Sequence, residues 1–387
     1  MIRAMNLCLI ARVRIAFVTL LVSVLCAFVV NVAAQEFKTV HDGVEYAELT
    51  RTIAGQPVKM NLLRLDLTKV RLDVHHAMDA AIGTEKTSSI ASRHNAAAAI
   101  NAGFFRLDTS IWAGDAAGVL MIDRKLLSES KDDRVVIAIT NSLNKTQVNF
   151  GHSVAGPMVK DDKYTTIDVN GINRQRTKDE VIVYTPEFGR STLTEPGGVE
   201  FIVRKGRVTA ISRNGSSLIP TDGFVLSCDG EESDGLLEKW RAGSKMRLSI
   251  PRIFPGYDVE PEDATNGVPQ LIKNGKIDIT WEQEKSSKSF VETRHPRTAV
   301  AKLKDGKFLM ITVDGRSESS GGIGLYDLAA LLLEFGAVEA MNLDGGGSTT
   351  MFLDGKVVNH PSDKEGERKV SDAILVTLRK KIVLKKK

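Results

Sequence analysis

The chain has 387 residues, of which 42% are hydrophobic and 26% charged, a balance typical of a globular protein rather than a disordered one. Its formal net charge of +4 is small, which argues against a nucleic-acid partner, since such partners usually require a clear basic excess. The sequence contains no H-E-x-x-H, no pair of C-x-x-C motifs and no G-x-x-x-x-G-K-S/T. Zincin, zinc-ribbon and P-loop chemistry therefore have no support.

The first residues have the pattern of a secretory signal peptide. Three arginines are followed by the apolar run 15–30 and then by the small residues Val32-Ala33-Ala34. We expect cleavage after residue 34 and export to the periplasm or the extracellular space. An uncleaved anchor is the alternative, but the apolar run is shorter than the roughly 20 residues of a bilayer span, so no stable membrane span is expected. Cleavage would remove three arginines and no acidic residue, which lowers the formal charge from +4 to +1.

The next part of the chain reads as β-rich. Apolar residues alternate in 58–66 and in 70–76, which predicts two strands joined as a hairpin. Residues 87–95 predict a short helix, and 96–101 a buried strand that ends at an asparagine. We assign residues 35–89 to an N-terminal β-rich extension of the domain that follows.

The second half of the chain contains a series of clear element signals. Residues 298–316 form two apolar runs around Asp305-Gly306, which predicts a β-hairpin. A helical stripe follows over 325–333, and Gly336 ends it. The apolar strand 337–341 then leads into a glycine-rich segment, after which residues 348–353 predict one more strand.

That glycine-rich segment, N-L-D-G-G-G-S at 342–348, is the strongest functional signal. Consecutive glycines allow positive φ and a very close approach of the backbone to a ligand. A carboxylate and a hydroxyl beside them indicate a site. The alternative is a tight hairpin in which Asp344 bonds only its own backbone.

Several motifs occur in the same order as in a known family. They are I-N-A-G-F-F (100–105), V-Y-T-P-E-F-G-R-S-T (183–192), I-P-T-D-G-F-V-L-S (219–227), R-H-P-R-T-A (294–299), V-D-G-R (313–316), N-L-D-G-G-G-S-T-T (342–350), V-V-N-H-P-S-D (357–363) and E-R-K-V-S-D-A (367–373). Over residues 90–378 the chain closely resembles the phosphodiester glycosidase family. The elements and the resemblance indicate an α+β fold with mixed, largely antiparallel sheets, packed helices and a single catalytic domain with a glycine-rich cleft. Residues 379–387 are expected to form a solvated basic tail.

The resemblance implies a hydrolase whose substrate is a sugar-phosphodiester or a glycopolymer. In the phosphodiester, the sugar is joined to the phosphate through its anomeric carbon. Cleavage of the C1–O bond expels a phosphomonoester, a good leaving group that needs little general-acid help. The enzyme must hold the phosphate and stabilise an oxocarbenium-like sugar, with a carboxylate as base or nucleophile. Arginine suits the phosphate because its planar guanidinium bonds two oxygens at once, and backbone N–H groups of a glycine-rich turn can add to the anion site.

Site residues follow from these roles. We expect Asp344 first, and Asp314 second, to be catalytic, although Asp314 could instead orient Arg316 or serve as a turn residue. The residues expected to bind substrate or phosphate are Asn101, Arg297, Arg316, Asn342, Gly345, Gly346, Gly347, Ser348 and Arg368. A helix, strand and Asn pattern that occurs twice hints that Asn101 and Asn342 share one cleft, with chance similarity as the alternative.

No cofactor is expected to be required, but a Ca²⁺ or Mg²⁺ ion could be held by oxygen ligands from Asp314, Asp344 and Asp372. Two other functions remain open. A glycopolymer-binding protein without turnover would be expected to lose a carboxylate, whereas Asp344 and Asp314 are both present. A metal-dependent phosphodiesterase that breaks the P–O bond would be expected to show a denser His/Asp cluster.

Overall fold

The computed structural model of the chain describes residues 37–153, 156–162, 166–250 and 260–380. The predicted signal peptide and residues 381–387 of the predicted basic tail lie outside these ranges. From Lys38 onward the described residues form one compact unit, built mostly from antiparallel sheets with few helices. In the part of the chain that is described, no helix is long and apolar enough to cross a bilayer.

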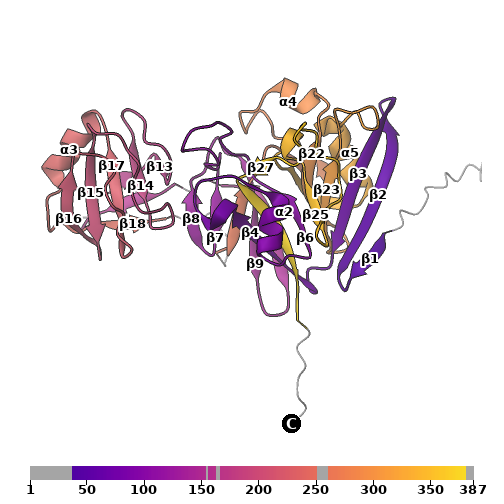
Figure 1. Cartoon of the computed structure of the whole chain (residues 1–387), viewed down its shortest axis with the longest axis horizontal. Helices are drawn as coiled ribbons and strands as arrows, with labels where there is room; N and C mark the ends of the chain where they lie inside the picture. Colours follow the sequence, from indigo (N-terminus) through magenta and orange to yellow (C-terminus); the bar gives the residue numbers. More distant parts are fainter. Residues whose placement is uncertain (1–36, 154–155, 163–165, 251–259, 381–387) are drawn as a thin grey trace, which may run out of the picture. The chain divides into compact units, whose positions relative to one another are not determined.

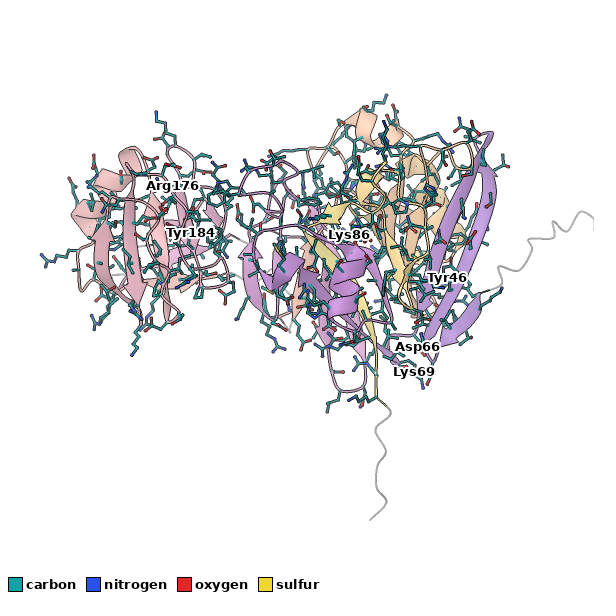
Figure 2. All side chains as sticks on the ribbon, viewed as in Figure 1. Tyr46, Asp66, Lys69, Lys86, Arg176 and Tyr184 are labelled. Atoms are coloured by element: carbon teal, nitrogen blue, oxygen red, sulfur yellow. The ribbon has the colours of Figure 1, made fainter. Side chains whose placement is uncertain are left out.

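The largest sheet has eight strands in the order β1-β2-β3-β23-β22-β24-β20-β21. Its strands are β1 (Lys38–His41), β2 (Val44–Ile53), β3 (Gln56–Leu65), β20 (Gln270–Lys273), β21 (Lys276–Ile277), β22 (Arg297–Leu303), β23 (Phe308–Val313) and β24 (Ala337–Asn342). The predicted hairpin around Asp305-Gly306 is confirmed as β22 and β23. Because β3 pairs with β23, the N-terminal strands belong to the same sheet as this hairpin. Across β2 and β3 the Tyr46 hydroxyl donates to Asn61 Oδ1 at 2.6 Å (Figure 2), and burial raises the pKa of Tyr46 to about 12.

A five-stranded sheet, β26-β25-β6-β28-β4, carries the predicted strand 96–101. Its strands are β4 (Val70–His76), β6 (Ala98–Asn101), β25 (Met351–Leu353), β26 (Lys356–Val357) and β28 (Asp372–Leu378). The short helix α2 (Thr87–Arg93) lies against one face of this sheet (Figure 1). Ile90 and Ala91 of the helix pack with Ala99 and Ala373 of the sheet. The predicted helix and the buried strand that follows it are both confirmed.

The predicted hairpin between 58–66 and 70–76 is wrong. Both segments are strands, but β3 pairs with β2 and β23, whereas β4 pairs with β28 in the other sheet. Asp66 and Lys69 make a turn between them, in which Lys69 N–H donates to Asp66 O at 2.8 Å (Figure 2). An alternating pattern shows that one face of a strand is buried, but it does not identify the strand's partner.

The remaining elements extend the β-rich architecture. A second five-stranded sheet, β10-β9-β19-β7-β8, contains β7 (Leu120–Ile122), β8 (Lys125–Ser128), β9 (Val135–Asn141), β10 (Thr146–His152) and β19 (Asp263–Asn266). A third, β13-β14-β17-β15-β16, contains β13 (Gly171–Ile172), β14 (Val181–Tyr184), β15 (Val199–Arg204), β16 (Arg207–Ser212) and β17 (Gly223–Cys228), and its pair β13–β14 is parallel. The smaller elements are β5 (Glu85–Lys86), β11 (Met158–Lys160), β12 (Thr166–Asp168), β18 (Arg247–Ser249), β27 (Lys369–Val370), η1 (Ala77–Asp79), η2 (Gly346–Ser348), α3 (Glu231–Lys239), α4 (Lys288–Glu292) and α5 (Leu325–Glu334).

One apolar cluster joins three of these sheets. It includes Met310 of the eight-stranded sheet, Ile100 and Ile374 of the sheet that carries β6, and Ile137 of the sheet that carries β9. The predicted helix at 325–333 is confirmed as α5, whose apolar stripe is buried. These packed layers hold the ends of β6 and β24 in fixed positions, and both strands end at an asparagine.

Glu284 is a buried carboxylate that connects two sheets. Its side chain accepts hydrogen bonds from the backbone N–H of Val135 at 3.0 Å, from that of Gln270 at 2.8 Å and from the Thr280 hydroxyl. Val135 begins β9 and Gln270 begins β20, and these strands belong to different sheets. Without this carboxylate, buried donors in both sheets would lose their acceptor.

We therefore expect Glu284→Ala to lower the free energy of unfolding by roughly 2–4 kcal/mol, because charged hydrogen bonds are lost and their donors stay buried. Denaturant unfolding monitored by circular dichroism measures this change. Glu282→Ala is the matched control, since Glu282 is exposed two residues away and its loss should cost less than about 0.5 kcal/mol. Equal stabilities of the two variants would contradict this role of Glu284.

Candidate functional site

The glycine-rich turn follows the end of β24 and is held by backbone hydrogen bonds to two other segments. Leu343 N–H donates to Thr298 O at 2.8 Å, and Gly346 N–H donates to Pro296 O at 2.8 Å. Asp344 N–H donates to Ala102 O at 2.9 Å, directly after β6. The ends of β6, β22 and β24 therefore meet at Asp344.

The three glycines of the turn lie against the Pro296-Arg297 segment and the guanidinium groups of two arginines. A Cβ atom on Gly345 would lie 2.8 Å from Pro296 O and 3.7 Å from Arg297 Cδ, and one on Gly346 would lie 3.1 Å from Arg316 Nη2. A Cβ atom on Gly347 would lie 2.2 Å from Arg368 Nη2, a clash that side chains essentially never show. Gly346 also has a φ of +60°, which favours glycine. Gly346 and Gly347 thus let two guanidinium groups approach the turn, and Gly345 lets the Pro296-Arg297 segment approach it.

The two asparagines predicted for the site are buried. Asn101 Nδ2 donates to Asp344 O at 2.7 Å, while its Oδ1 accepts from the Thr298 hydroxyl at 2.9 Å and from Thr350 N–H at 3.0 Å. Asn101 therefore acts on the site by positioning Asp344 rather than by presenting its amide to solvent. Asn342 Nδ2 donates to Val268 O at 2.7 Å, and its buried Oδ1 has no hydrogen-bond partner among the described residues.

Asp344 is half-buried, and its pKa is raised to about 6. Burial is the main cause, and the charge of Asp372 adds to it. The Ser348 hydroxyl, the Arg368 charge and the Gly345 N–H oppose the increase. A carboxylate with such a pKa is ionised at neutral pH but is poorly solvated, which suits a base or a nucleophile.

Asp314, at the end of β23, is a second buried carboxylate. Its Oδ1 accepts from His360 N–H at 3.0 Å and from Asn359 Nδ2 at 3.4 Å. Its Oδ2 is buried and has no hydrogen-bond partner among the described residues. Burial raises its pKa, while the bonds from His360 and Asn359 lower it. One oxygen of Asp314 thus holds the 359–360 segment, and the other is available.

The three arginines differ in their surroundings. Arg297 is 2% exposed, and it donates to the backbone oxygens of Phe290, Thr293 and Ile323. Burial and, to a lesser extent, the Arg316 charge together lower its pKa to about 10, and no acidic group acts in the other direction. Such a buried cation is electrostatically uncompensated within the described residues, a condition that a bound anion would relieve.

Arg316 and Arg368 lie nearer to solvent. Arg316 is exposed, and its Nη1 donates to the Ser362 hydroxyl at 3.4 Å. Arg368 is paired with Asp363 through two hydrogen bonds, Nε to Oδ2 at 2.7 Å and Nη2 to Oδ1 at 3.0 Å. Asp363 therefore neutralises one of the two guanidinium groups beside the turn and fixes its plane.

Some neighbours of the site were not among the predicted site residues. Asp372, weighed only as a metal ligand, accepts from Gly103 N–H at 3.1 Å and from the Thr265 hydroxyl at 2.6 Å, and it raises the pKa of Asp344. Asp363 lies inside a family-like motif, so its pairing with Arg368 had a sequence signal. Thr265 lies in β19 in no such motif, and only the fold brings it here.

The arrangement of acidic groups also bears on metal binding. Asp314, Asp344 and Asp372 do not form a group of ligand atoms within 4.8 Å of one another, and within the described ranges the one such group is His75, Asp79 and His94. The carboxylate site for Ca²⁺ or Mg²⁺ that the sequence suggested therefore remains a hypothesis without a geometric basis.

A cavity of about 730 Å³ lies beside this region. Its lining includes Phe105, Arg106, Asp115 and Gly118, but not the glycine-rich turn. A Cβ atom on Gly118 would lie 2.9 Å from Asn266 Cβ, and one on Gly103 would lie 2.9 Å from Asn266 Nδ2. Asn266 thus separates the cavity from the Gly103 and Asp372 side of the site.

Comparisons with known proteins agree with this arrangement. Residues 197–377 match the family model described as phosphodiester glycosidase. The N-acetylglucosamine-1-phosphodiester alpha-N-acetylglucosaminidase of Mus musculus is 33% identical over 203 residues, which cover 44% of this chain and 39% of that protein. The enzyme of the same name from Bos taurus is 39% identical over 202 residues, which cover 44% of this chain and 38% of that protein. The chain therefore spans less than half the length of these relatives.

A solved structure shares the fold. The crystal structure of a hypothetical protein from Synechocystis superposes with a TM-score of 0.76 at 24% sequence identity, over 87% of this chain and 62% of that one. The glycine-rich turn, its arginines and Asp344 all lie inside the matched range 197–377. Residues 197–377 of the chain are therefore similar to the phosphodiester glycosidase family.

Proposed function

We propose that this protein is an exported hydrolase that cleaves the C1–O bond of a sugar-1-phosphodiester and releases the sugar and a phosphomonoester. The observation that carries the proposal is the approach of the Arg316 and Arg368 guanidinium groups to two successive glycines beside Asp344. Similarity to the family and to the named mammalian glycosidases supports the substrate class. Export rests on the N-terminal sequence pattern alone.

In the proposed reaction the glycine-rich turn and its neighbouring arginines bind the phosphate. Arg316 is exposed and has no carboxylate partner among the described residues, so its guanidinium is free to bond two phosphate oxygens. Arg297 contributes an uncompensated positive charge from within the protein. Arg368, whose charge Asp363 already balances, contributes less attraction and more orientation.

Asp344 is the carboxylate proposed to act on the sugar carbon or on the attacking water. Its backbone is fixed on both sides, since its N–H donates to Ala102 O and its C=O accepts from Asn101 Nδ2. A fixed position is what a nucleophile or base requires, because the reacting atoms must lie within about 3–3.5 Å of each other. The phosphomonoester is a good leaving group because its negative charge is delocalised, so its departure needs no strong general-acid catalysis.

The bond that breaks can be identified by isotope labelling. Hydrolysis of the methyl diester of a sugar 1-phosphate in ¹⁸O-labelled water should place the label on the anomeric oxygen of the released sugar, because the attack is at carbon. Mass spectrometry of both products makes the measurement, with a heat-inactivated sample as the control. Label in the phosphate product would show P–O cleavage and refute the glycosidase assignment.

Asp344→Asn tests the catalytic carboxylate. The change nearly preserves shape but removes the charge, so kcat should fall on the order of 10²- to 10⁴-fold while the unfolding transition stays close to that of the parent. Asp354→Asn is the matched control, because Asp354 also precedes a glycine after a strand but is exposed and pairs with His41. Near-parental turnover in Asp344→Asn would reject its assignment and make Asp314 the leading candidate.

Arg316→Ala tests phosphate binding. Because this guanidinium is exposed and makes one long hydrogen bond, folding should survive while KM rises at least about tenfold, the loss expected for a charged hydrogen bond of about 1.5–3 kcal/mol. Steady-state kinetics on the diester measures the change. Arg207→Ala, at an exposed arginine on β16, should leave KM unchanged. A KM equal to the parent's in Arg316→Ala would remove Arg316 from the phosphate site.

A further inference from the structure

Three potential metal ligands meet beside α2, on residues that the proposed reaction does not use. His75 lies on β4 and pairs with Ala373 of β28, and directly paired residues point to the same face of a sheet. Ala373 packs against Ile90 of α2, so His75 points to the face that α2 covers. His94 follows the last residue of α2, and its ring stacks on His75 with centroids 3.7 Å apart.

Asp79 completes the group. It ends the short helix η1, and its Oδ1 lies 3.0 Å from His94 Nε2. One ligand atom from each of His75, Asp79 and His94 lies within 4.8 Å of the other two. Zinc bonds to nitrogen and carboxylate oxygen at about 2.0–2.2 Å, so small side-chain rotations would bring all three atoms to one ion.

The space around these ligands is sufficient for an ion and its water. A cavity of about 280 Å³ is lined by all three side chains. Asp123 and Glu187 line the same cavity and could accept hydrogen bonds from a coordinated water. The residues that contact the glycine-rich turn are not part of this lining, so the two sites are separate.

The hydrogen bonds of His94 conflict in the absence of an ion. Its Nε2 lies 3.0 Å from Asp79 Oδ1, an acceptor, and 3.0 Å from Arg93 Nη1, a donor. A protonated Nε2 suits Asp79 but opposes the Arg93 N–H, and an unprotonated Nε2 suits Arg93 but opposes the carboxylate. A metal ion between Nε2 and Oδ1 would accept electron pairs from both atoms and remove the conflict.

The surroundings of Arg93 and His75 are compatible with a metal ion at this position. Arg93 Nη1 pairs with Asp79 Oδ2. Arg93 also bonds the Glu85 carboxylate, through Nη2 at 2.9 Å and Nε at 3.4 Å, so it keeps an ionic partner if a metal ion displaces it from Asp79. Neither ring nitrogen of His75 has a hydrogen bond to another described residue, which leaves a half-buried imidazole without the partner that such groups normally find.

We propose that His75, Asp79 and His94 bind one divalent transition-metal ion of the zinc type, with water completing the coordination. Two imidazoles and one carboxylate with an open position form a ligand set that Zn²⁺ uses in proteins. The ion would link β4, η1 and the end of α2, and so would stabilise the folded chain.

Titration of the chelator-treated protein with Zn²⁺ in a calorimeter tests the proposal. We expect one ion per chain in the parent, and at least about tenfold weaker binding in His94→Ala and in Asp79→Asn. His41→Ala is the matched control, since His41 also contacts an exposed carboxylate, Asp354 at 2.7 Å, but lacks a second histidine. Its affinity should equal the parent's.

Two further measurements make the result independent of variant folding. Zn²⁺ should raise the Tm of the parent but not that of His94→Ala, and Arg93→Gln should bind Zn²⁺ at least as tightly as the parent because a competing cation is removed. Absence of saturable binding in the parent would overturn the proposal. So would equal affinities in the parent and His94→Ala, which would place the ion elsewhere.

Discussion

The side-chain amide of Asn101 ties together the segments on which the candidate site depends. It bonds the carbonyl of Asp344, the hydroxyl of Thr298 and the N–H of Thr350, so one side chain connects β6, β22 and both sides of the glycine-rich turn. A buried amide with these partners has strong orientation preferences, because each misplaced group would be left unpaired in a low-dielectric region. The position of the Asp344 carboxylate thus follows from the position of β6 in its sheet.

The second constraint is electrostatic. The guanidinium groups of Arg316 and Arg368 approach two successive glycines, the buried Arg297 follows the Pro296 that contacts the turn, and of these three arginines only Arg368 has an acidic partner within the described part of the chain. Like charges at this range repel, and Arg316 accordingly lowers the pKa of Arg297. Glycine makes the approach possible, because any side chain at 345 or 347 would occupy the space of Pro296 O or of the Arg368 guanidinium. The turn therefore lies in a region of concentrated positive charge.

Much of the fold could be read from the sequence, because local signals there are strong. The hairpin at 298–316, the helix ended by Gly336 and the strand before Asn342 all have turn or capping residues that fix their limits. The sequence could not show that β3 pairs with β23 and β4 with β28, because these partners lie more than 200 residues away along the chain. Sequence patterns identify a buried face but not the strand that covers it.

In the candidate site, too, local sequence signals predicted some features, whereas others depend on long-range contacts. Asp344, Arg316 and Arg368 stand next to glycines or to family-like motifs, and the structure brings them together. The burial of Arg297 was not readable, because it depends on the backbone oxygens of Phe290, Thr293 and Ile323. The second role of Asn101, as the support of Asp344, was likewise hidden in long-range contacts.

The place of β28 determines the order in which the chain can fold. β28 lies between β6 and β4, although more than 270 residues separate it from β6 in the sequence. Contacts of such high sequence separation form slowly, because the entropy of closing the loop must be lost first. Until residues 372–378 have been synthesised, β4 has no partner in this sheet and β6 lacks its neighbour on one side. A growing chain would therefore carry open strand edges, which are templates for pairing with other chains.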